Sequence, residues 1–162
     1  MKLSIIIPVF NEEDSLRELY HQINDSIKMF EEYEIVFIDD GSSDASKLII
    51  QNMVEKDSRV KLISFFRNFG KSAALAEGFK YASGDIIITM DADLQDDPNE
   101  IPVLIRKLNE GFDLVSGWKK KRYDPRTKTF PSKIFNFVTR ILTGVKIHDF
   151  NCGLKAYRNS VV

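Results

Sequence analysis

The sequence predicts an α/β fold: a doubly wound, mostly parallel sheet flanked by helices. Apolar runs of strand length alternate along the chain with segments of helical hydrophobic spacing, which is typical of βαβ units. The strands are apolar on both faces, as in a sheet that helices cover on each side. Ligands of open α/β sheets bind beyond the carboxyl ends of the strands. We therefore expect one domain over 1–162, with its site at that edge.

The expected elements follow in chain order. The first strand, over 3–10, contains Pro8 near its end, where a missing ladder hydrogen bond is tolerated. A helix over 13–30 comes next, with Asn11 as its expected cap. The remaining elements are strands over 34–39 and 60–66, a strand that begins at Ile86 and a strand over 112–117, with helices after Asp44, over 71–81 and over 101–108. A basic loop and an amphipathic helix are expected over 118–146.

Composition and charge limit the classes of protein to which this chain can belong. The net charge is −1, so no nucleic-acid partner is expected. Cys152 is the one cysteine, which excludes an intrachain disulfide and fits a reducing compartment. No apolar run reaches the roughly 20 residues of a membrane span. The chain stops at Val162 without a helix stop or a polar tail, which predicts that the natural protein continues beyond it.

The most informative residues follow the strand that begins at Ile86. In extended backbone, residues two apart point to the same side, so Asp91 and Asp93 are expected to direct two carboxylates at one point. Such oxygen ligands suit Mg²⁺ or Mn²⁺ shared with substrate phosphates, and Gln95 would add a further oxygen. The alternative is a solvated acidic turn. Three further acids are expected only to stabilise the start of the next helix: Asp96, Asp97 and Glu100.

A second acidic pair, Asp39 and Asp40, also follows a buried strand. One of the two is expected to accept hydrogen bonds from a base or a ribose hydroxyl, as acids do in nucleotide folds. The alternative is a capping turn, and Asp44 is expected to be only a cap. The chain has neither a Gly-x-Gly-x-x-Gly motif nor a P-loop motif. If a nucleotide diphosphate binds, a metal ion must therefore neutralise it.

The stretch 119–133 carries seven cations against the single acid Asp124. It is either a solvated loop or the wall that binds a second, anionic partner. The amphipathic segment that follows packs in the core or, together with the basic stretch, contacts anionic lipids at a membrane surface.

Five motifs occur in the order of a known family: IPVFNE at 7–12, IDDGSSD at 38–44, RNFGK at 67–71, DADLQDDP at 91–98 and DFNCGLK at 149–155. On these motifs the chain resembles the family 2 glycosyltransferases of the GT-A (Rossmann-like) fold. Within that family it is most similar to the polyprenyl-phosphate branch, which includes dolichyl-phosphate mannose synthases. The motifs span nearly the whole chain.

The resemblance implies a role for each matched position. The residues that would bind the nucleotide-sugar donor are Pro8, Phe10, Glu12, Asp40 or Asp39, Lys71, Asp91 and Ala92. The metal ligands would be Asp91, Asp93 and Gln95, and the catalytic residues Asp93 and Asp149. The acceptor phosphate would lie against Lys119, Arg126, Ser132 and Lys133; relatives commonly carry arginine where this chain has Lys119.

The implied activity is a metal-dependent, inverting transfer of a sugar from a UDP- or GDP-linked donor to a polyprenyl phosphate. A phosphate monoester has a second pKa of about 6, so it is already ionised and needs cations more than a base. The alternative acceptor is a saccharide hydroxyl in cell-surface polysaccharide synthesis, which would need a general base, and Asp149 is the candidate. Two further alternatives are a haloacid-dehalogenase-like phosphatase and a non-catalytic nucleotide-binding or self-associating domain.

The resemblance also sets an expected location. We expect a cytoplasmic protein in peripheral contact with the inner face of the membrane, where a lipid-linked acceptor is available. Self-association as a homo-oligomer is compatible with the sequence.

Overall fold

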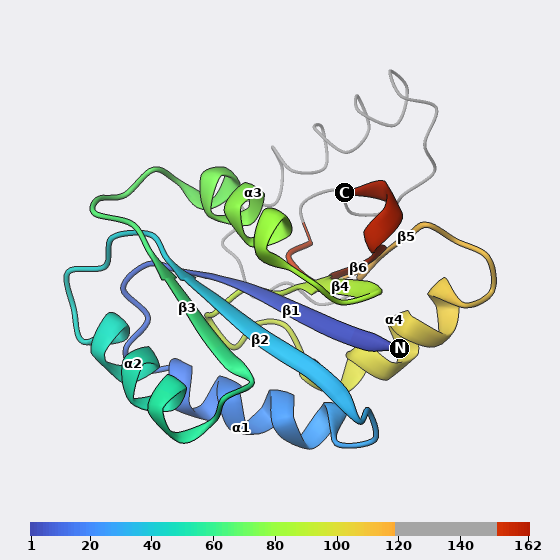
Figure 1. Ribbon diagram of the computed structural model, residues 1–162, viewed down its shortest axis with the longest axis horizontal. Helices are drawn as coiled ribbons and strands as arrows, with labels where there is room; N and C mark the ends of the chain where they lie inside the picture. Colours follow the sequence, from blue (N-terminus) through green and yellow to red (C-terminus); the bar gives the residue numbers. More distant parts are fainter. Residues whose placement is uncertain (119–151) are drawn as a thin grey trace, which may run out of the picture.

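The computed structural model describes residues 1–118 and 152–162, which form one mixed sheet with helices on both faces (Figure 1). The elements are β1 (Lys2–Val9), α1 (Leu16–Ile27), β2 (Glu32–Asp39), α2 (Ser46–Lys56), β3 (Val60–Ser64), α3 (Lys71–Tyr81), β4 (Ile86–Thr89), the 3₁₀ turn η1 (Pro98–Glu100), α4 (Ile101–Leu108), β5 (Leu114–Ser116), β6 (Lys155–Arg158) and the 3₁₀ turn η2 (Asn159–Val161). The strand order is β3-β2-β1-β4-β6-β5. The first four strands are parallel, and β6 is antiparallel to both β4 and β5.

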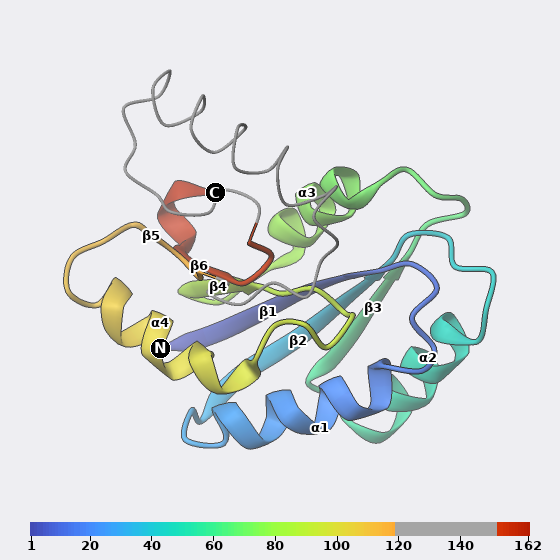
Figure 2. The same ribbon diagram turned by 180° about the vertical axis from the view of Figure 1, so that it is seen from behind.

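Helices cover the two faces of the sheet unequally, and the two views show α1 and α2 on one side and α3 on the other (Figures 1 and 2). The larger core joins α1, α2 and α4 to the sheet and includes Phe37, one of the largest fully buried side chains. The smaller core joins α3 to the sheet through Ala74. The expected α/β class, with a doubly wound and mostly parallel sheet, is confirmed.

Several local expectations are wrong: the first helix ends at Ile27 rather than at residue 30, and the strand expected over 112–117 spans only Leu114–Ser116. The first helix begins at Leu16, and Asn11 does not cap it. Asn11 has a φ of 57°, and its side-chain oxygen accepts the Ser43 N–H at 2.8 Å, so it ties two loops together instead. The third strand ends at Ser64 rather than at residue 66. The strand β6 was not expected, because four residues are too few to show a pattern. The basic loop and helix expected over 118–146 lie outside the described residues, apart from Trp118.

The strand order places a crevice at one edge of the sheet. Connections from β1 run outward through β2 and β3, whereas α3 returns the chain to β4 on the opposite side of β1. The ladder between β1 and β4 ends at the pair Ile6 and Thr89, so the chain beyond Pro8 separates from β4. Such a reversal of strand order is where ligands of open α/β sheets bind.

At the opposite edge of the sheet, where the parallel strands begin, a buried carboxylate links β2 to β1 and to the chain before β4. Glu34 accepts the hydroxyl of Ser4 at 2.6 Å and both the N–H and the hydroxyl of Ser83, at 2.9 and 2.8 Å. Burial raises the pKa of Glu34, but these hydrogen bonds and the charge of Lys2 outweigh burial, so its pKa lies below the usual value. This edge is therefore structural. None of the helices in the described ranges is long and apolar enough to cross a membrane.

Candidate active site

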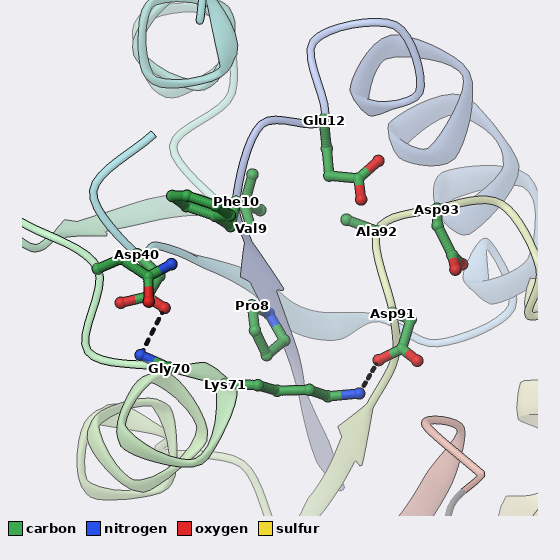
Figure 3. A pocket seen from close by; sticks show the side chains of 11 residues that line it. Pro8, Val9, Phe10, Glu12, Asp40, Gly70, Lys71, Asp91, Ala92 and Asp93 are labelled. Carbon is green, nitrogen blue, oxygen red and sulfur yellow. Dashed lines mark hydrogen bonds and ion pairs between the residues drawn. The ribbon is translucent and has the colours of Figure 1, made fainter. Parts of the chain in front are cut away.

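A cleft of about 340 Å³ opens at the reversal point between β1 and β4 (Figure 3). Four segments form it: the end of β1 and the turn after it, the end of β2, the start of α3 and the loop after β4. The lining residues are Pro8, Val9, Phe10, Glu12, Asp40, Asn68, Gly70, Lys71, Asp91, Ala92 and Asp93. The structure thus brings together the residues assigned to the donor by resemblance, with the exception of Asp39.

Both acids at the end of β2 hold the backbone in place. The two oxygens of Asp40 accept the N–H groups of Phe69 at 2.7 Å and Gly70 at 2.9 Å, and the residue is 3% exposed. Asp39 accepts the Ser42 N–H and the Ser64 hydroxyl, both at 3.0 Å, and does not line the cleft. A hydrogen bond that Asp40 would accept from a bound nucleotide remains a prediction, and it would use the carboxylate lone pairs that the two N–H groups do not occupy.

Asp91 forms an ion pair with Lys71, the first residue of α3 (Figure 3). A Cβ added to Gly153 would lie 2.5 Å from the Asp91 carboxylate, so this carboxylate packs directly against the glycine. Within the loop after β4, Asp96 is 4% exposed, and its carboxylate accepts the Asp91 N–H at 3.2 Å. Lys71, Gly153 and Asp96 therefore fix the position of Asp91.

The structure of this loop corrects two expectations: the role of Asp96 and the extended spacing of Asp91 and Asp93. Asp96 supports the loop rather than the next helix, whereas Asp97 does cap the turn η1, because its side chain accepts the Asn99 N–H at 2.9 Å. The strand β4 ends at Thr89, and the chain bends beyond Asp91. The extended alternation expected for the acidic motif is therefore absent. Tertiary contacts place the Asp91 carboxylate, whereas Asp93 accepts a local hydrogen bond from the Gln95 N–H.

The described residues that line the cleft carry an excess of negative charge. They include the carboxyl groups of Glu12, Asp40, Asp91 and Asp93 against the single ammonium of Lys71. Burial and the nearby charges of Asp93 and Asp91 raise the pKa of Glu12, although a hydrogen bond from Ser15 opposes them. A nucleotide diphosphate would be repelled here unless a cation entered with it.

The donor set fits Mg²⁺ or Mn²⁺ bound together with a diphosphate. Within residues 1–118 and 152–162, no three His, Cys, Asp or Glu side chains form a ready-made metal cage. Asp93 is exposed and accepts the Gln95 N–H at 3.0 Å through one oxygen. Asp93, and Gln95 two residues further on, would supply the one or two protein oxygens that Mg²⁺ usually takes, the rest coming from phosphate and water. The carboxylate of Asp91, the third expected ligand, is paired with Lys71.

Several expected site residues lie outside the described residues: Asp149, Lys119, Arg126, Ser132 and Lys133. Other residues of the site were not assigned a role from sequence. Asn68 and Gly70 line the cleft, and Gly153 touches Asp91. All three lie within the motifs on which the family resemblance rests. The sequence therefore identified the segments that form the site, but not which of their residues contact one another.

The fold and the acidic cleft at its reversal point define a domain of the GT-A glycosyltransferase type. The chain belongs to Glycosyl transferase family 2, whose family model matches residues 4–162. The family inferred from the five motifs is thereby confirmed.

Two bacterial relatives carry the same name, undecaprenyl-phosphate 4-deoxy-4-formamido-L-arabinose transferase. The protein from Pseudomonas fluorescens (strain Pf0-1) is 41% identical over 162 residues, which are 99% of this chain and 48% of that protein. The protein from Salmonella choleraesuis (strain SC-B67) is 42% identical over 163 residues, covering 99% of this chain and 50% of that protein. The chain thus spans about half the length of the curated relatives it matches.

Solved structures share the fold at low identity. Glucosyl-3-phosphoglycerate synthase from Mycobacterium tuberculosis, in complex with phosphoglyceric acid, is 22% identical with a TM-score of 0.76, covering 99% of this chain and 57% of that one. The mannosyltransferase PcManGT from Pyrobaculum calidifontis, in complex with GDP-Man and Mn²⁺, is 21% identical with a TM-score of 0.71, covering 96% and 44%. These similarities establish the fold.

Proposed function

We propose that this chain is the donor-binding domain of an inverting glycosyltransferase that transfers a sugar from a nucleotide-sugar to a polyprenyl phosphate, using Mg²⁺ or Mn²⁺. The observation that carries the proposal is the cleft, where Glu12, Asp91 and Asp93 meet the end of β1 and the start of α3. The names of the relatives that are 41–42% identical support the acceptor class. Fold neighbours in complex with GDP-Man or UDP-glucose and Mn²⁺ support the donor and metal class.

In this proposal the residues of the cleft bind and orient the donor. Pro8 and Phe10 flank the base, and Glu12 and Asp40 face the ribose. Asp91, Asp93 and Gln95 would hold the divalent ion, which when bound would neutralise charge on the leaving diphosphate. An acceptor phosphate oxygen then donates an electron pair to the anomeric carbon, and the bond from this carbon to the diphosphate breaks, with its electrons leaving on the diphosphate.

The acceptor determines whether a base is required. A polyprenyl phosphate is already ionised at neutral pH and needs positioning by cations, for which Lys119, Arg126, Ser132 and Lys133 are the candidates. A saccharide hydroxyl would instead need a general base, for which Asp149 is the candidate. We propose the phosphate acceptor, and with it a peripheral location at the cytoplasmic face of the membrane that holds such lipids.

Donor binding is tested by a thermal-shift panel of UDP-, GDP- and dTDP-sugars with Mn²⁺. One class of donor is expected to raise the melting temperature of the wild type, and Asp93→Asn is expected to abolish the Mn²⁺-dependent part of that rise. The matched control is Asp85→Asn, which removes one exposed carboxylate at the opposite edge of the sheet, where it accepts the Lys2 N–H at 2.9 Å. A full shift in Asp93→Asn would contradict the metal assignment.

The acceptor is tested by offering the preferred donor with undecaprenyl phosphate or with a saccharide. Transfer to the prenyl phosphate alone is expected. Transfer to the saccharide alone would replace the proposal with the polysaccharide alternative. Because donor binding is measured separately, failure of transfer does not obscure the donor result.

A further inference from the structure

A groove of about 170 Å³ lies between α1 and α2, on the face of the sheet opposite α3 (Figures 1 and 2). Three residues of each helix line it: Arg17, Tyr20, His21, Asn52, Met53 and Lys56. None of these six residues lines the donor cleft. A ligand in the groove would therefore be held by side chains that the proposed donor site does not use.

Contacts within the protein shape this groove. The lining residues of each helix lie three or four positions apart, so they share one face of that helix. The Tyr20 hydroxyl donates to the Asp57 carboxylate at 2.8 Å, and Asp57 directly follows α2. The His21 ring packs edge-to-face on the Tyr20 ring, with 5.6 Å between the centroids. The groove is therefore formed before any ligand binds.

The groove contains cations that have no protein counter-ion. Its described lining carries the guanidinium of Arg17, the ammonium of Lys56 and the imidazole of His21, and no carboxyl group. None of these three side chains forms a hydrogen bond or an ion pair within residues 1–118 and 152–162. Elsewhere in these ranges, several lysine and arginine side chains pair with an acid close by in sequence. The positive charge in the groove is thus uncompensated by the described residues.

The acids near the groove leave this charge in place. Asp57 contacts Tyr20, but its carboxylate also accepts the Arg59 guanidinium through two bonds of 2.9 Å each. Glu18 and Glu55 are sequence neighbours of the lining cations, yet neither lines the groove, and Glu18 accepts the Gln22 amide at 2.8 Å. Cations that face one groove repel one another, and a bound anion would remove this repulsion.

The remaining lining defines the class of anion. Met53, which is 8% exposed, and the Tyr20 ring add apolar surface, which suits a ligand with an organic body. The Arg17 guanidinium can donate two parallel hydrogen bonds to a phosphate, and the Lys56 ammonium can balance its second charge. We propose that the groove between α1 and α2 is a second binding site, for the phosphate monoester of a small organic molecule. This inference does not rest on the proposed transferase function.

The test titrates phenyl phosphate, a phosphate monoester on an aromatic body, into the full chain. Heteronuclear NMR follows the amide signals, and saturable shifts are expected in α1 and α2 around Arg17 and Lys56. Arg17→Gln and Lys56→Gln are each expected to weaken binding about tenfold, because each removes a charge-assisted hydrogen bond. Lys56→Arg is expected to retain most of the binding, since it keeps the charge.

Lys47→Gln is the matched control for Arg17→Gln. Arg17 is the second residue of α1, Lys47 is the second residue of α2, and Lys47 does not line the groove. A cation in the first turn of a helix is unfavourable, so both variants are expected to keep or raise the melting temperature. Only Arg17→Gln should lose affinity for phenyl phosphate. An equal loss in both would show that binding follows overall charge, and would overturn the site.

Further arms identify the source of the phosphate. Inorganic phosphate should bind more weakly than phenyl phosphate, because it lacks a body to contact Met53 and Tyr20. Vesicles containing phosphatidic acid that bound the wild type but not Arg17→Gln would assign the phosphate to a lipid headgroup. Absence of vesicle binding would assign it to a soluble molecule.

Two results would overturn the inference. One is the absence of shifts in α1 and α2, or an unchanged affinity in both Arg17→Gln and Lys56→Gln. The other is displacement of phenyl phosphate by a nucleotide-sugar with Mn²⁺, which would place the ligand in the donor cleft instead. Because phenyl phosphate binding is measured without a donor, it stands or falls independently of the proposed function.

Discussion

Lys71 balances charge at the centre of the cleft. Its ammonium group is paired with Asp91, and this pair joins the start of α3 to the loop after β4 at the lining of the cleft. A cation on a flexible side chain is a reversible counter-ion, since it can move to a phosphate when another cation takes over the carboxylate.

Replacing Lys71 with methionine is expected to affect metal and nucleotide in opposite directions. Without the ammonium, Asp91 is uncompensated, so Mn²⁺ alone should bind about threefold more tightly, while the Mn²⁺-free nucleotide should bind more weakly. Electron paramagnetic resonance of free Mn²⁺ and calorimetry of the nucleotide measure the two effects. Lys80→Met, at the other end of α3, serves as the control. A parallel loss of both affinities would show that Lys71 is needed for folding of the site rather than for its charge.

Gly153 sets the position of Asp91 by having no side chain. In Gly153→Ala the new Cβ would lie 2.5 Å from the Asp91 carboxylate, so that carboxylate must rotate away. We expect a folded protein whose affinity for the Mn²⁺-nucleotide falls about tenfold, equivalent to about 1.4 kcal/mol. Gly84→Ala is the matched control, because Gly84 is equally crowded, 2.6 Å from the Ser4 nitrogen, but lies at the opposite edge. It should lower stability and leave nucleotide affinity intact.

At the scale of elements, the turn between α2 and β3 is held to α1 by one carboxylate. Asp57 accepts the Arg59 guanidinium through two bonds of 2.9 Å each and the Tyr20 hydroxyl at 2.8 Å. The hydrogen bonds from Arg59 lower the pKa of Asp57 to about 2, against an opposing effect of burial. The charged form of Asp57 is therefore favoured in the folded protein.

Asp57→Asn is expected to destabilise the protein by about 1–2 kcal/mol at pH 7, after allowance for the exposure of Arg59. Because the folded pKa lies below the unfolded value of 3.8, this stabilisation is complete above about pH 5 and is lost as the pH falls through 3.8 toward 2. Urea unfolding of both proteins at pH 7, 4 and 3 measures the difference. A gap that stayed constant down to pH 3 would show that the Asp57 charge does not contribute.

Element bounds were predictable where local signals agree. The helices α3 and α4 begin and end where the sequence indicated, since Gly70 and Gly84 flank α3 and apolar spacing defines α4. The start of α1 was missed because the side chain of Asn11 bonds to Ser43, which lies in another loop. For the candidate site, too, some features could be predicted from the sequence and others could not. The motifs located Asp91 and Asp93, but the contacts of Asp91 with Lys71 and Gly153 depend on segments distant in the chain.

At the scale of the whole molecule, the two edges of the sheet have different roles. At one edge Glu34 is buried, and serine hydrogen bonds keep its pKa low. At the other edge, carboxylates line an open cleft, and the pKa of Glu12 is raised chiefly by burial and further by neighbouring acids. The charged groups at the first edge stabilise the fold, while those at the second line the open cleft, where we expect ligands to compensate them.

The antiparallel strand β6 also determines the order in which the chain can fold. β4 and β5 lie on either side of β6, and β6 is the pairing partner of β5 in the described part of the chain. Strands β1 to β4 come from the first 89 residues and can pair as soon as they are synthesised, whereas β5 must wait for residues 155–158. Arg158 then closes the turn after α4, donating to the Leu108 carbonyl at 3.0 Å.

Pulse-labelled hydrogen exchange during refolding should reveal this order. The amides of β1, β2 and β4 are expected to gain protection first, and those of β5 and β6 together in a later phase, because they pair residues as far apart in the chain as Leu114 and Tyr157. Simultaneous protection of β4 and β5 would contradict this sequence of events. On the ribosome, the edge of β4 that pairs with β6 would remain unpaired until β6 emerged, so the nascent chain would pass through a period in which it is prone to aggregate.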